Sequence, residues 1–286
     1  MKQVGFIVGT GRCGTTILAQ VLNSHSEICV PCELQIICGI GNGDRLHERY
    51  IAGDFEKYGS EDFISLFEKR CPYYFDRYFD YREHFRQLKY PQKDLRRLLT
   101  VLFDHICYDQ KKTIFLEQTP WYGQRLDLLQ ELFPEMKVVH IIRDGRDVAI
   151  SYARTPWWSN DIAGNLIRWD KEVNVIHSFG QRNPENYIEV RYEDLLTDPA
   201  RELSRILDFF GIFIEDEMLD AGNLIEYSDM FKGNYNEYIS NENMKWKREK
   251  RNVFFNENIQ SWKNYSGYDF MNIPDTVNKT LMNFHY

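Results

Sequence analysis

The segment of the sequence with the clearest chemical potential is a glycine-rich stretch at residues 9–16, which reads GTGRCGTT. It lies between an apolar run and an amphipathic one, the strand–loop–helix context in which backbone N–H groups and a helix N-terminus bind phosphate. A Walker A loop has this glycine spacing but requires lysine where this chain has Thr15, which argues against a kinase. Arg12 offers instead a guanidinium that can bind two anionic oxygens at once. The segment predicts a site for a phosphate-like anion, and a small-molecule kinase using ATP and Mg²⁺ is the alternative.

A second basic segment, residues 138–152, reads VVHIIRDGRDVAISY. Arg143 stands at the expected C-terminal end of a strand, and Ser151 follows eight residues later in the expected helix. Both positions face the crevice in which open parallel sheets bind ligands, so a guanidinium and a hydroxyl can meet there on one phosphate. Taken alone, Arg143 could instead be a structural ion-pair partner of Asp144 or Asp147.

Together these two segments resemble the sulfotransferases that use 3′-phosphoadenosine 5′-phosphosulfate (PAPS), whose first strand and loop read like Ile-Val-Gly-x-x-Arg-Ser-Gly-Thr-Thr. The match departs at Cys13, where the family usually has serine. Segment 138–152 resembles the family's 3′-phosphate element, and residues 191–196 resemble its Tyr-Glu-Asp-Leu block, in which the tyrosine helps to hold the nucleotide. The resemblance implies that PAPS is the co-substrate, adenosine 3′,5′-bisphosphate the product and a hydroxyl or amine the acceptor of a sulfuryl group, with no metal required.

The resemblance extends to the C-terminal part of the chain. Lys245-Trp246-Lys247 is similar to the basic and aromatic loop that folds over PAPS, where lysine meets phosphate and an indole can cover adenine. The flanking residues lack the family's usual glycine, and a solvated charged loop is the alternative there. The PAPS-binding residues that the resemblance implies are Arg12, Cys13, Gly14, Thr15, Thr16, Arg143, Ser151, Tyr192, Lys245 and Trp246.

The catalytic residues that the resemblance implies are Arg12 and Glu33. In the tyrosylprotein and related Golgi-type sulfotransferases, a glutamate twenty-one residues after the loop arginine acts as the base, and Glu33 has that spacing from Arg12. Sulfuryl transfer requires such a base and a cationic, N–H-rich clamp on the leaving phosphate. His25 is the competing base, but it follows the expected end of the first helix, where related families carry histidine for structural reasons.

Residues 116–120, LEQTP, resemble the family's Glu-Lys-Thr-Pro segment, in which the lysine approaches the sulfate. Gln118 replaces that lysine, and an amide can donate a hydrogen bond but cannot neutralise charge. Several residues, including Lys245 and Arg146, could supply the missing cation, and the sequence does not choose among them. A protein that binds the nucleotide without transferring the sulfuryl group is therefore a further alternative.

These residues need a parallel sheet and its connecting helices to bring them together. Short apolar runs alternate along the chain with amphipathic stretches, a rhythm typical of successive βα units. We predict an α/β fold of the three-layer, P-loop-like type, with a central parallel sheet and a single domain over residues 1–286. A mostly helical insertion is expected at about 36–112 and a loop-rich C-terminal lobe at about 215–286. The strands are expected at 4–8, 27–30, 113–116, 138–142 and 187–190, and the helices at 15–22, 126–132, 146–154 and 199–210.

Composition limits the partners. The chain has 286 residues and a formal net charge of −8, which favours neither nucleic acid nor an anionic membrane. The sequence shows no signal-peptide core and no membrane-spanning run, so a cytoplasmic location is expected. It shows no metal-ligand spacing, so no metal is expected. The expected acceptor is a small molecule, a glycan or a phenol such as a peptide tyrosine, and a metabolite or nodulation-factor-like glycan is the first choice.

Overall fold

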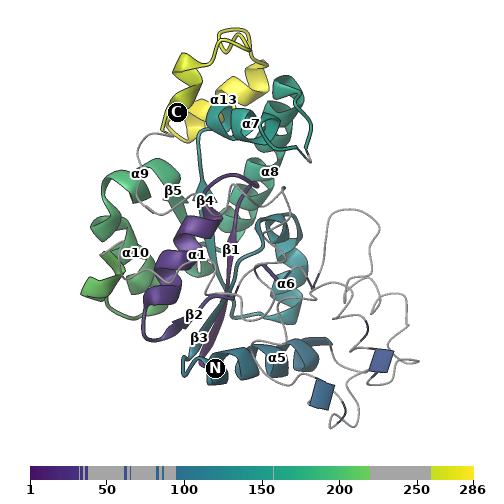
Figure 1. Cartoon of the computed structure of the whole chain (residues 1–286), viewed down its shortest axis with the longest axis vertical. Coiled ribbons are helices and arrows are strands. Elements are labelled where there is room, and N and C mark those ends of the chain that lie inside the picture. Colours follow the sequence, from purple (N-terminus) through teal and green to yellow (C-terminus); the bar gives the residue numbers. More distant parts are fainter. Residues whose placement is uncertain are drawn as a thin grey trace.

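The centre of the protein is a sheet of five parallel strands in the order β2-β3-β1-β4-β5 (Figure 1). The structure is a computed structural model, and it describes residues 1–31, 33–34, 36–37, 61–62, 65, 82–83, 86, 95–156, 158–219 and 259–286. The strands are β1 (Gln3–Val8), β2 (Ile28–Cys29), β3 (Ile114–Glu117), β4 (Lys137–Ile142) and β5 (Tyr187–Arg191). Each begins and ends within one residue of its expected bounds, and the predicted α/β class with a parallel sheet is confirmed.

Helices lie on both sides of this sheet and make the fold three-layered. Figure 1 shows α1 and α10 on one side and α6 and α8 on the other. The helices are α1 (Thr15–Ser24), α5 (Leu95–Asp109), α6 (Leu126–Leu132), α7 (Gly145–Ala153), α8 (Ile162–Arg182), α9 (Tyr192–Thr197), α10 (Pro199–Phe210) and α13 (Asp275–Asn283). Short 3₁₀ helices span Pro120–Arg125, Pro184–Asn186, Asp216–Leu219 and Ser261–Asn264.

The register of the central strands places the two predicted anion-binding segments next to each other. β1 pairs in parallel with β4, and Val8 at the end of β1 lies opposite His140. The chain therefore leaves β1 at residue 9 and β4 at residue 143 along the same edge of the sheet. Residues 138–142 of β4 are all buried, as expected of an interior strand that is covered on both faces.

Two hydrophobic clusters hold the layers together. In the larger one, Phe103 of α5 stacks on Phe115 of β3 with ring centroids 4.0 Å apart and packs on Phe133, which follows α6. The smaller cluster joins α7, α8 and the C-terminal residues, with Trp169 of α8 and Leu281 of α13 among its members. The C-terminal segment is thus fixed to the helix that follows β4.

The described residues contain helices that the sequence does not predict. They are α8, a helix of 21 residues, α9 and α13. The described part of the C-terminal lobe, residues 259–286, contains α13 and packs against α8. Of the expected insertion, α5 is described as a helix, and most of the remainder lies outside the described residues.

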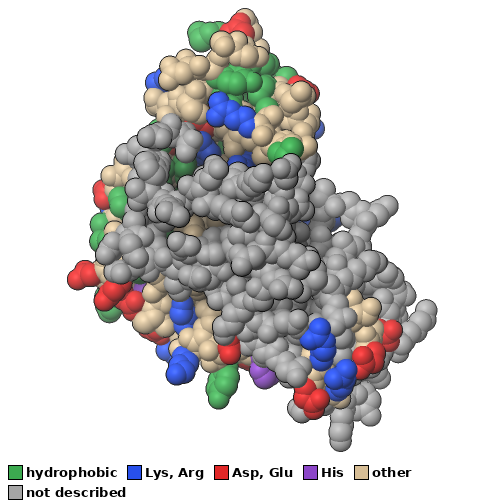
Figure 2. Space-filling view, viewed as in Figure 1, with side chains coloured by type: hydrophobic (Ala, Val, Ile, Leu, Met, Phe, Trp, Pro, Cys, Tyr) green, Lys and Arg blue, Asp and Glu red, His purple; other side chains and the backbone are tan. Residues whose placement is uncertain are grey.

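Charged side chains of both signs are mixed on the visible face that the described residues form (Figure 2). Among the helices of the described ranges, none combines the length and the apolar character needed to cross a membrane.

Candidate active site

The glycine-rich loop leaves β1 after Val8 and enters α1 at Thr15. Gly14 has a φ of 102° and Arg12 a φ of 70°, both in the left-handed region. A Cβ at Gly14 would lie 2.7 Å from Cε2 of Tyr192, so only glycine allows α9 to approach the loop this closely. A non-glycine residue at positive φ is uncommon and is often found at functional sites. The loop ends where the first N–H groups of α1, which lack partners within the helix, can bind an anion.

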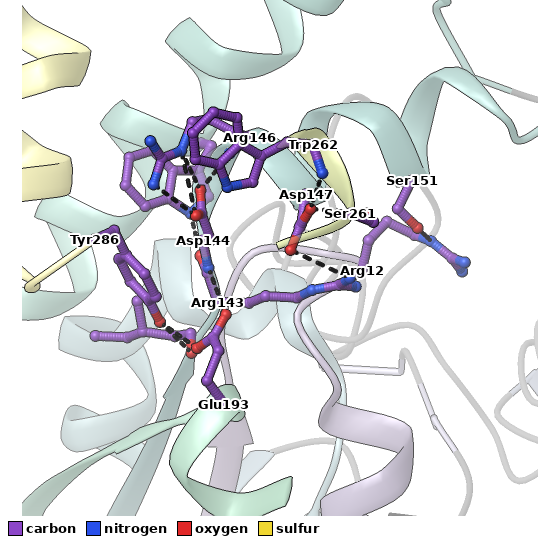
Figure 3. Close-up of polar contacts among 12 residues, drawn as sticks. Arg12, Arg143, Asp144, Arg146, Asp147, Ser151, Glu193, Ser261, Trp262 and Tyr286 are labelled. Atoms are coloured by element: carbon purple, nitrogen blue, oxygen red, sulfur yellow. Dashed lines mark hydrogen bonds and ion pairs between the residues drawn. The ribbon is translucent and has the colours of Figure 1, made fainter. Parts of the chain in front are cut away.

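The two arginines that the sequence predicts at one site lie side by side (Figure 3). Arg12 Nε donates to Ser151 Oγ at 3.0 Å, and Arg143 Nη1 donates to the main-chain carbonyl of Arg12 at 3.1 Å. Burial lowers the pKa of Arg12, and the nearby Arg143 cation adds to that shift. Ser151 therefore contacts the loop arginine directly, and Arg143 contacts the backbone of the loop. Two adjacent, partly buried cations form a site that a bound anion would stabilise.

Arg143 is held on several sides. Its guanidinium carbon lies 4.7 Å from the centre of the Tyr192 ring, a cation–π distance, and its Nη2 lies 4.0 Å from Oδ2 of Asp147. The indole of Trp169 donates to its carbonyl at 3.0 Å. Asp144 does not pair with Arg143, because it forms a 2.7 Å ion pair with Arg146. The contact with Asp147 is at the limit of ion-pair distance. Arg143 therefore forms an ion pair with Asp147 and also contacts the loop.

Asp147 attaches the C-terminal segment to this site, which the sequence did not predict. Its Oδ1 accepts from Ser261 Oγ at 2.8 Å and from the Trp262 N–H at 2.9 Å. Burial raises the pKa of this carboxyl, although Arg143 opposes the rise. The Trp262 ring lies 3.8 Å from the guanidinium carbon of Arg146.

A signal for this contact exists in the sequence. The Trp-Lys dipeptide of the predicted C-terminal loop, 246–247, occurs a second time at 262–263. The second copy lies at the site, whereas Lys245 and Trp246 fall outside the described residues.

Glu33, the predicted base, follows β2 and is half-buried beside the end of β3. Gln118 Nε2 donates to Glu33 Oε1 at 3.4 Å. The neighbouring Glu117, which is fully buried, accepts from the Leu34 N–H at 3.1 Å and from Thr119 Oγ1 at 2.7 Å. These contacts fix the chain around Glu33 to the end of β3. The Glu33 charge is close enough to Arg12 to oppose the burial that lowers the pKa of that guanidinium.

His25, the competing base, lies at the end of α1 that is remote from the loop. Its Nδ1 accepts from the Glu27 N–H at 2.9 Å, and its Nε2 lies 3.0 Å from the Phe213 carbonyl oxygen. Both ring nitrogens are therefore used in holding the chain after α1 to the chain after α10. This placement supports the structural interpretation of His25.

Three other residues of the predicted PAPS-binding set, Cys13, Thr15 and Thr16, lie in the loop and in the first turn of α1. The Cys13 side chain is fully buried in the larger core cluster, and burial raises the pKa of its thiol to about 12. Thr15 is buried and Thr16 half-buried in the first turn of α1. Within the described ranges, no group of three histidine, cysteine, aspartate or glutamate side chains is arranged to hold a metal ion.

Comparisons with known proteins identify the family of this chain. A family model described as the sulfotransferase family matches residues 6–216. Protein-tyrosine sulfotransferase A of Caenorhabditis elegans is 22% identical over 240 residues, which cover 77% of this chain and 53% of that protein. The nodulation protein NoeE of Sinorhizobium fredii is 22% identical over 228 residues, which cover 72% of this chain and 49% of that protein. This chain thus spans about half the length of these curated relatives.

A solved structure supports the fold. The sulfotransferase domain of the olefin synthase from Synechococcus PCC 7002 superposes with a TM-score of 0.67 at 20% sequence identity. The superposition covers 100% of this chain and 96% of that domain.

Proposed function

The chain belongs to the sulfotransferase family, and from this premise we propose that it transfers a sulfuryl group from PAPS to a hydroxyl or amine of an acceptor molecule. The observation that carries the proposal is the meeting of the glycine-rich loop with two side chains of the segment at 138–152. Arg12, Arg143 and Ser151 form one connected group at the edge of the sheet, with Glu33 within electrostatic reach of Arg12. A ligand that carries more than one anionic group suits such a site.

Different residues bind the two ends of PAPS in this proposal. The backbone N–H groups at 14–16 and the Arg12 guanidinium bind the phosphosulfate end. Arg143 binds the 3′-phosphate, with Ser151 and Tyr192 as neighbours, and Tyr192 already stacks on its guanidinium. Lys245 and Trp246 remain predicted contacts to the nucleotide.

Glu33 acts as the base in this proposal. It takes the proton from the acceptor's hydroxyl or amine as that oxygen or nitrogen bonds to sulfur. The bond between sulfur and the 5′-phosphate oxygen breaks, and Arg12 with the loop amides binds the charge left on that oxygen. Gln118 donates to Glu33 and so orients the carboxylate. No electrons are transferred, and the products are the sulfated acceptor and adenosine 3′,5′-bisphosphate.

We expect an acceptor that carries a ring, such as a sugar or a phenol. Two half-buried indoles, Trp121 and Trp158, stack near the loop with centroids 6.0 Å apart, and such surfaces favour flat apolar groups. A Cβ built on Gly11 would lie 3.6 Å from the ring of Trp121, which places this indole against the loop. The name of one relative, a protein-tyrosine sulfotransferase, is compatible with a phenolic acceptor.

Two measurements test the proposed function. Isothermal titration should show binding of adenosine 3′,5′-bisphosphate, and a preference for ATP with Mg²⁺ would overturn the proposal in favour of a kinase. Incubation with labelled PAPS and pooled hydroxylated acceptors should transfer the label. Binding of the bisphosphate without any transfer would identify a nucleotide-binding relative that has lost catalysis.

The base is tested by Glu33→Gln, which should lower kcat by about a hundredfold or more because the amide cannot accept a proton. The affinity for adenosine 3′,5′-bisphosphate should stay unchanged. Glu27→Gln is the matched control, since Glu27 is partly exposed and pairs with Lys2 away from the loop. Full turnover by Glu33→Gln would exclude Glu33 as the base.

A further inference from the structure

Tyr152, which follows Ser151 on α7, has a hydroxyl that the site described above does not yet use. The side chain is 2% exposed. Its ring lies 5.1 Å from the Trp158 ring and 5.6 Å from the Arg168 guanidinium carbon. Arg168 also lies over Trp158 and pairs with Glu172 at 2.6 Å. The tyrosine ring is therefore held in one place by neighbours that are themselves fixed.

The ring points its hydroxyl at the glycine-rich loop. A Cβ built on Gly11 would lie 2.9 Å from Cζ of Tyr152 and closer still to the hydroxyl oxygen. Gly11 directly precedes Arg12, whose Nε donates to Ser151. The hydroxyl thus reaches the same loop as the proposed anion clamp, from the side of α7.

Within the part of the chain that the structure describes, this buried hydroxyl has no hydrogen-bond partner. The fully buried Tyr122 does have one, since its hydroxyl accepts from the Ile37 N–H at 2.9 Å, and the half-buried Tyr187 donates to Glu189 at 2.6 Å. Burying a hydroxyl without a partner is unfavourable, so its position against the glycine-rich loop calls for a functional explanation.

The protonation state of Tyr152 makes it a donor. Burial raises the pKa of Tyr152 above its ordinary value, and the nearby carboxylate of Glu172 raises it further, while the cations of Arg168 and Arg12 oppose the shift. The phenol is therefore protonated at neutral pH. A rigidly placed O–H group beside two arginines is suited to an anionic oxygen.

We propose that Tyr152 is a substrate-binding residue, whose hydroxyl donates a hydrogen bond to an anionic oxygen of the ligand held at loop 9–16. The inference rests on the proposed function, under which that oxygen belongs to the phosphosulfate end of PAPS. Tyr152 then joins Arg12 in binding the end of the nucleotide at which the reaction occurs, and it carries no charge of its own.

Tyr152→Phe tests this role because the proposal predicts opposite effects on the free and the bound protein. Without ligand, the melting temperature should be unchanged or higher, since an unpartnered hydroxyl is removed. The affinity for PAPS, measured by isothermal titration, should fall about tenfold, which corresponds to about 1.4 kcal/mol. A fall for adenosine 3′,5′-bisphosphate as well places the bond on the 5′-phosphate, and a fall for PAPS alone places it on the sulfonate.

Tyr187→Phe is the matched control, because the Tyr187 hydroxyl is bonded to Glu189 and its ring lies on β5, away from the loop. That variant should lower the melting temperature and leave the ligand affinity unchanged. Unchanged affinity for both nucleotides in Tyr152→Phe would overturn the role of Tyr152 while leaving the proposed function intact. If the unaltered protein prefers ATP with Mg²⁺, the proposed function fails, and the same pair of variants titrated with ATP decides whether the hydroxyl binds an anion at the loop.

Discussion

Replacing Gly14 by alanine tests the contact on which the shape of the loop depends. Gly14 combines a φ of 102° with the ring of Tyr192 directly over it, so the new methyl group would meet both a strained backbone and a filled space. Tyr192 in turn lies 4.7 Å from the guanidinium carbon of Arg143. Displacing the ring would therefore disturb the proposed 3′-phosphate site as well as the loop.

The cost can be worked out from these two effects. Left-handed backbone costs a residue with a Cβ about 1–2 kcal/mol. Forcing a methyl group into a packed contact costs about 1–3 kcal/mol. The free energy of unfolding should therefore fall by about 2–5 kcal/mol, and the melting temperature by roughly 5–15 °C for a chain of this size.

The assay is thermal unfolding of Gly14→Ala beside a control that has the strain but not the collision. Gly211, which ends α10, has a φ of 76°, and no atom would lie within 4 Å of a Cβ added there. Gly211→Ala should therefore lose only about 1–2 kcal/mol of unfolding free energy. Titration with adenosine 3′,5′-bisphosphate should show at least about a tenfold loss of affinity for Gly14→Ala and none for Gly211→Ala.

Equal losses of unfolding free energy in Gly14→Ala and Gly211→Ala would refute the reasoning. The close approach of Tyr192 to Gly14 would then add nothing to the cost of the substitution. A loss of stability without any loss of affinity would separate the packing of Tyr192 from the nucleotide site. In that case the placement of Arg143 would not depend on the ring.

Two other contacts give further predictions. Asp147→Ala leaves the Ser261 hydroxyl and the Trp262 N–H without their acceptor, so the unfolding free energy measured in urea should fall by about 1–3 kcal/mol, and a smaller loss for Ser261→Ala is the comparison. Glu189 shows the effect of pH: burial alone would raise its pKa, but contacts with His140, His177 and Tyr187 outweigh burial and hold the pKa at about 2. A carboxyl whose pKa is depressed in the folded state adds stability above its unfolded pKa, here 4.5, and loses it as the pH falls toward 2. The melting temperature of Glu189→Gln should therefore depend less on pH between about 4.5 and 2 than that of the unaltered protein, and parallel curves would contradict this assignment.

Local sequence patterns were sufficient for the sheet and for the loop. The five strands are short apolar runs bounded by polar or glycine residues, and those boundaries are visible without any tertiary information. The proximity of Arg12 and Arg143 could also be predicted, since strands that enter a parallel sheet bring their carboxyl ends to one edge. The fine contacts could not: the bond between Arg12 and Ser151 depends on how far α7 turns back over the loop.

The helix and the contacts that the sequence did not predict were missed for different reasons. The buried residues of α8, such as Leu166, Trp169 and Val173, recur at helical spacing, so the signal was present but was interrupted by charged and glycine residues. The attachment of Trp262 to Asp147 joins residues 115 positions apart, and the repeated Trp-Lys dipeptide does not indicate which residue it contacts. The Tyr152 hydroxyl was missed because its significance lies in the partner it lacks among the described residues, which only a three-dimensional arrangement reveals.

The strand order has a consequence for how the chain folds as it is synthesised. β1 is made first, yet its neighbours are β3 and β4, whose paired residues begin at Ile114 and Lys137. β1 therefore lacks both neighbouring strands until the chain has been synthesised as far as β3 and β4. Parallel pairing over such separations is slow because a long loop must close first. Chains interrupted before Tyr192 would lack the ring that covers Gly14, so a ribosome-bound fragment ending there should remain susceptible to proteases.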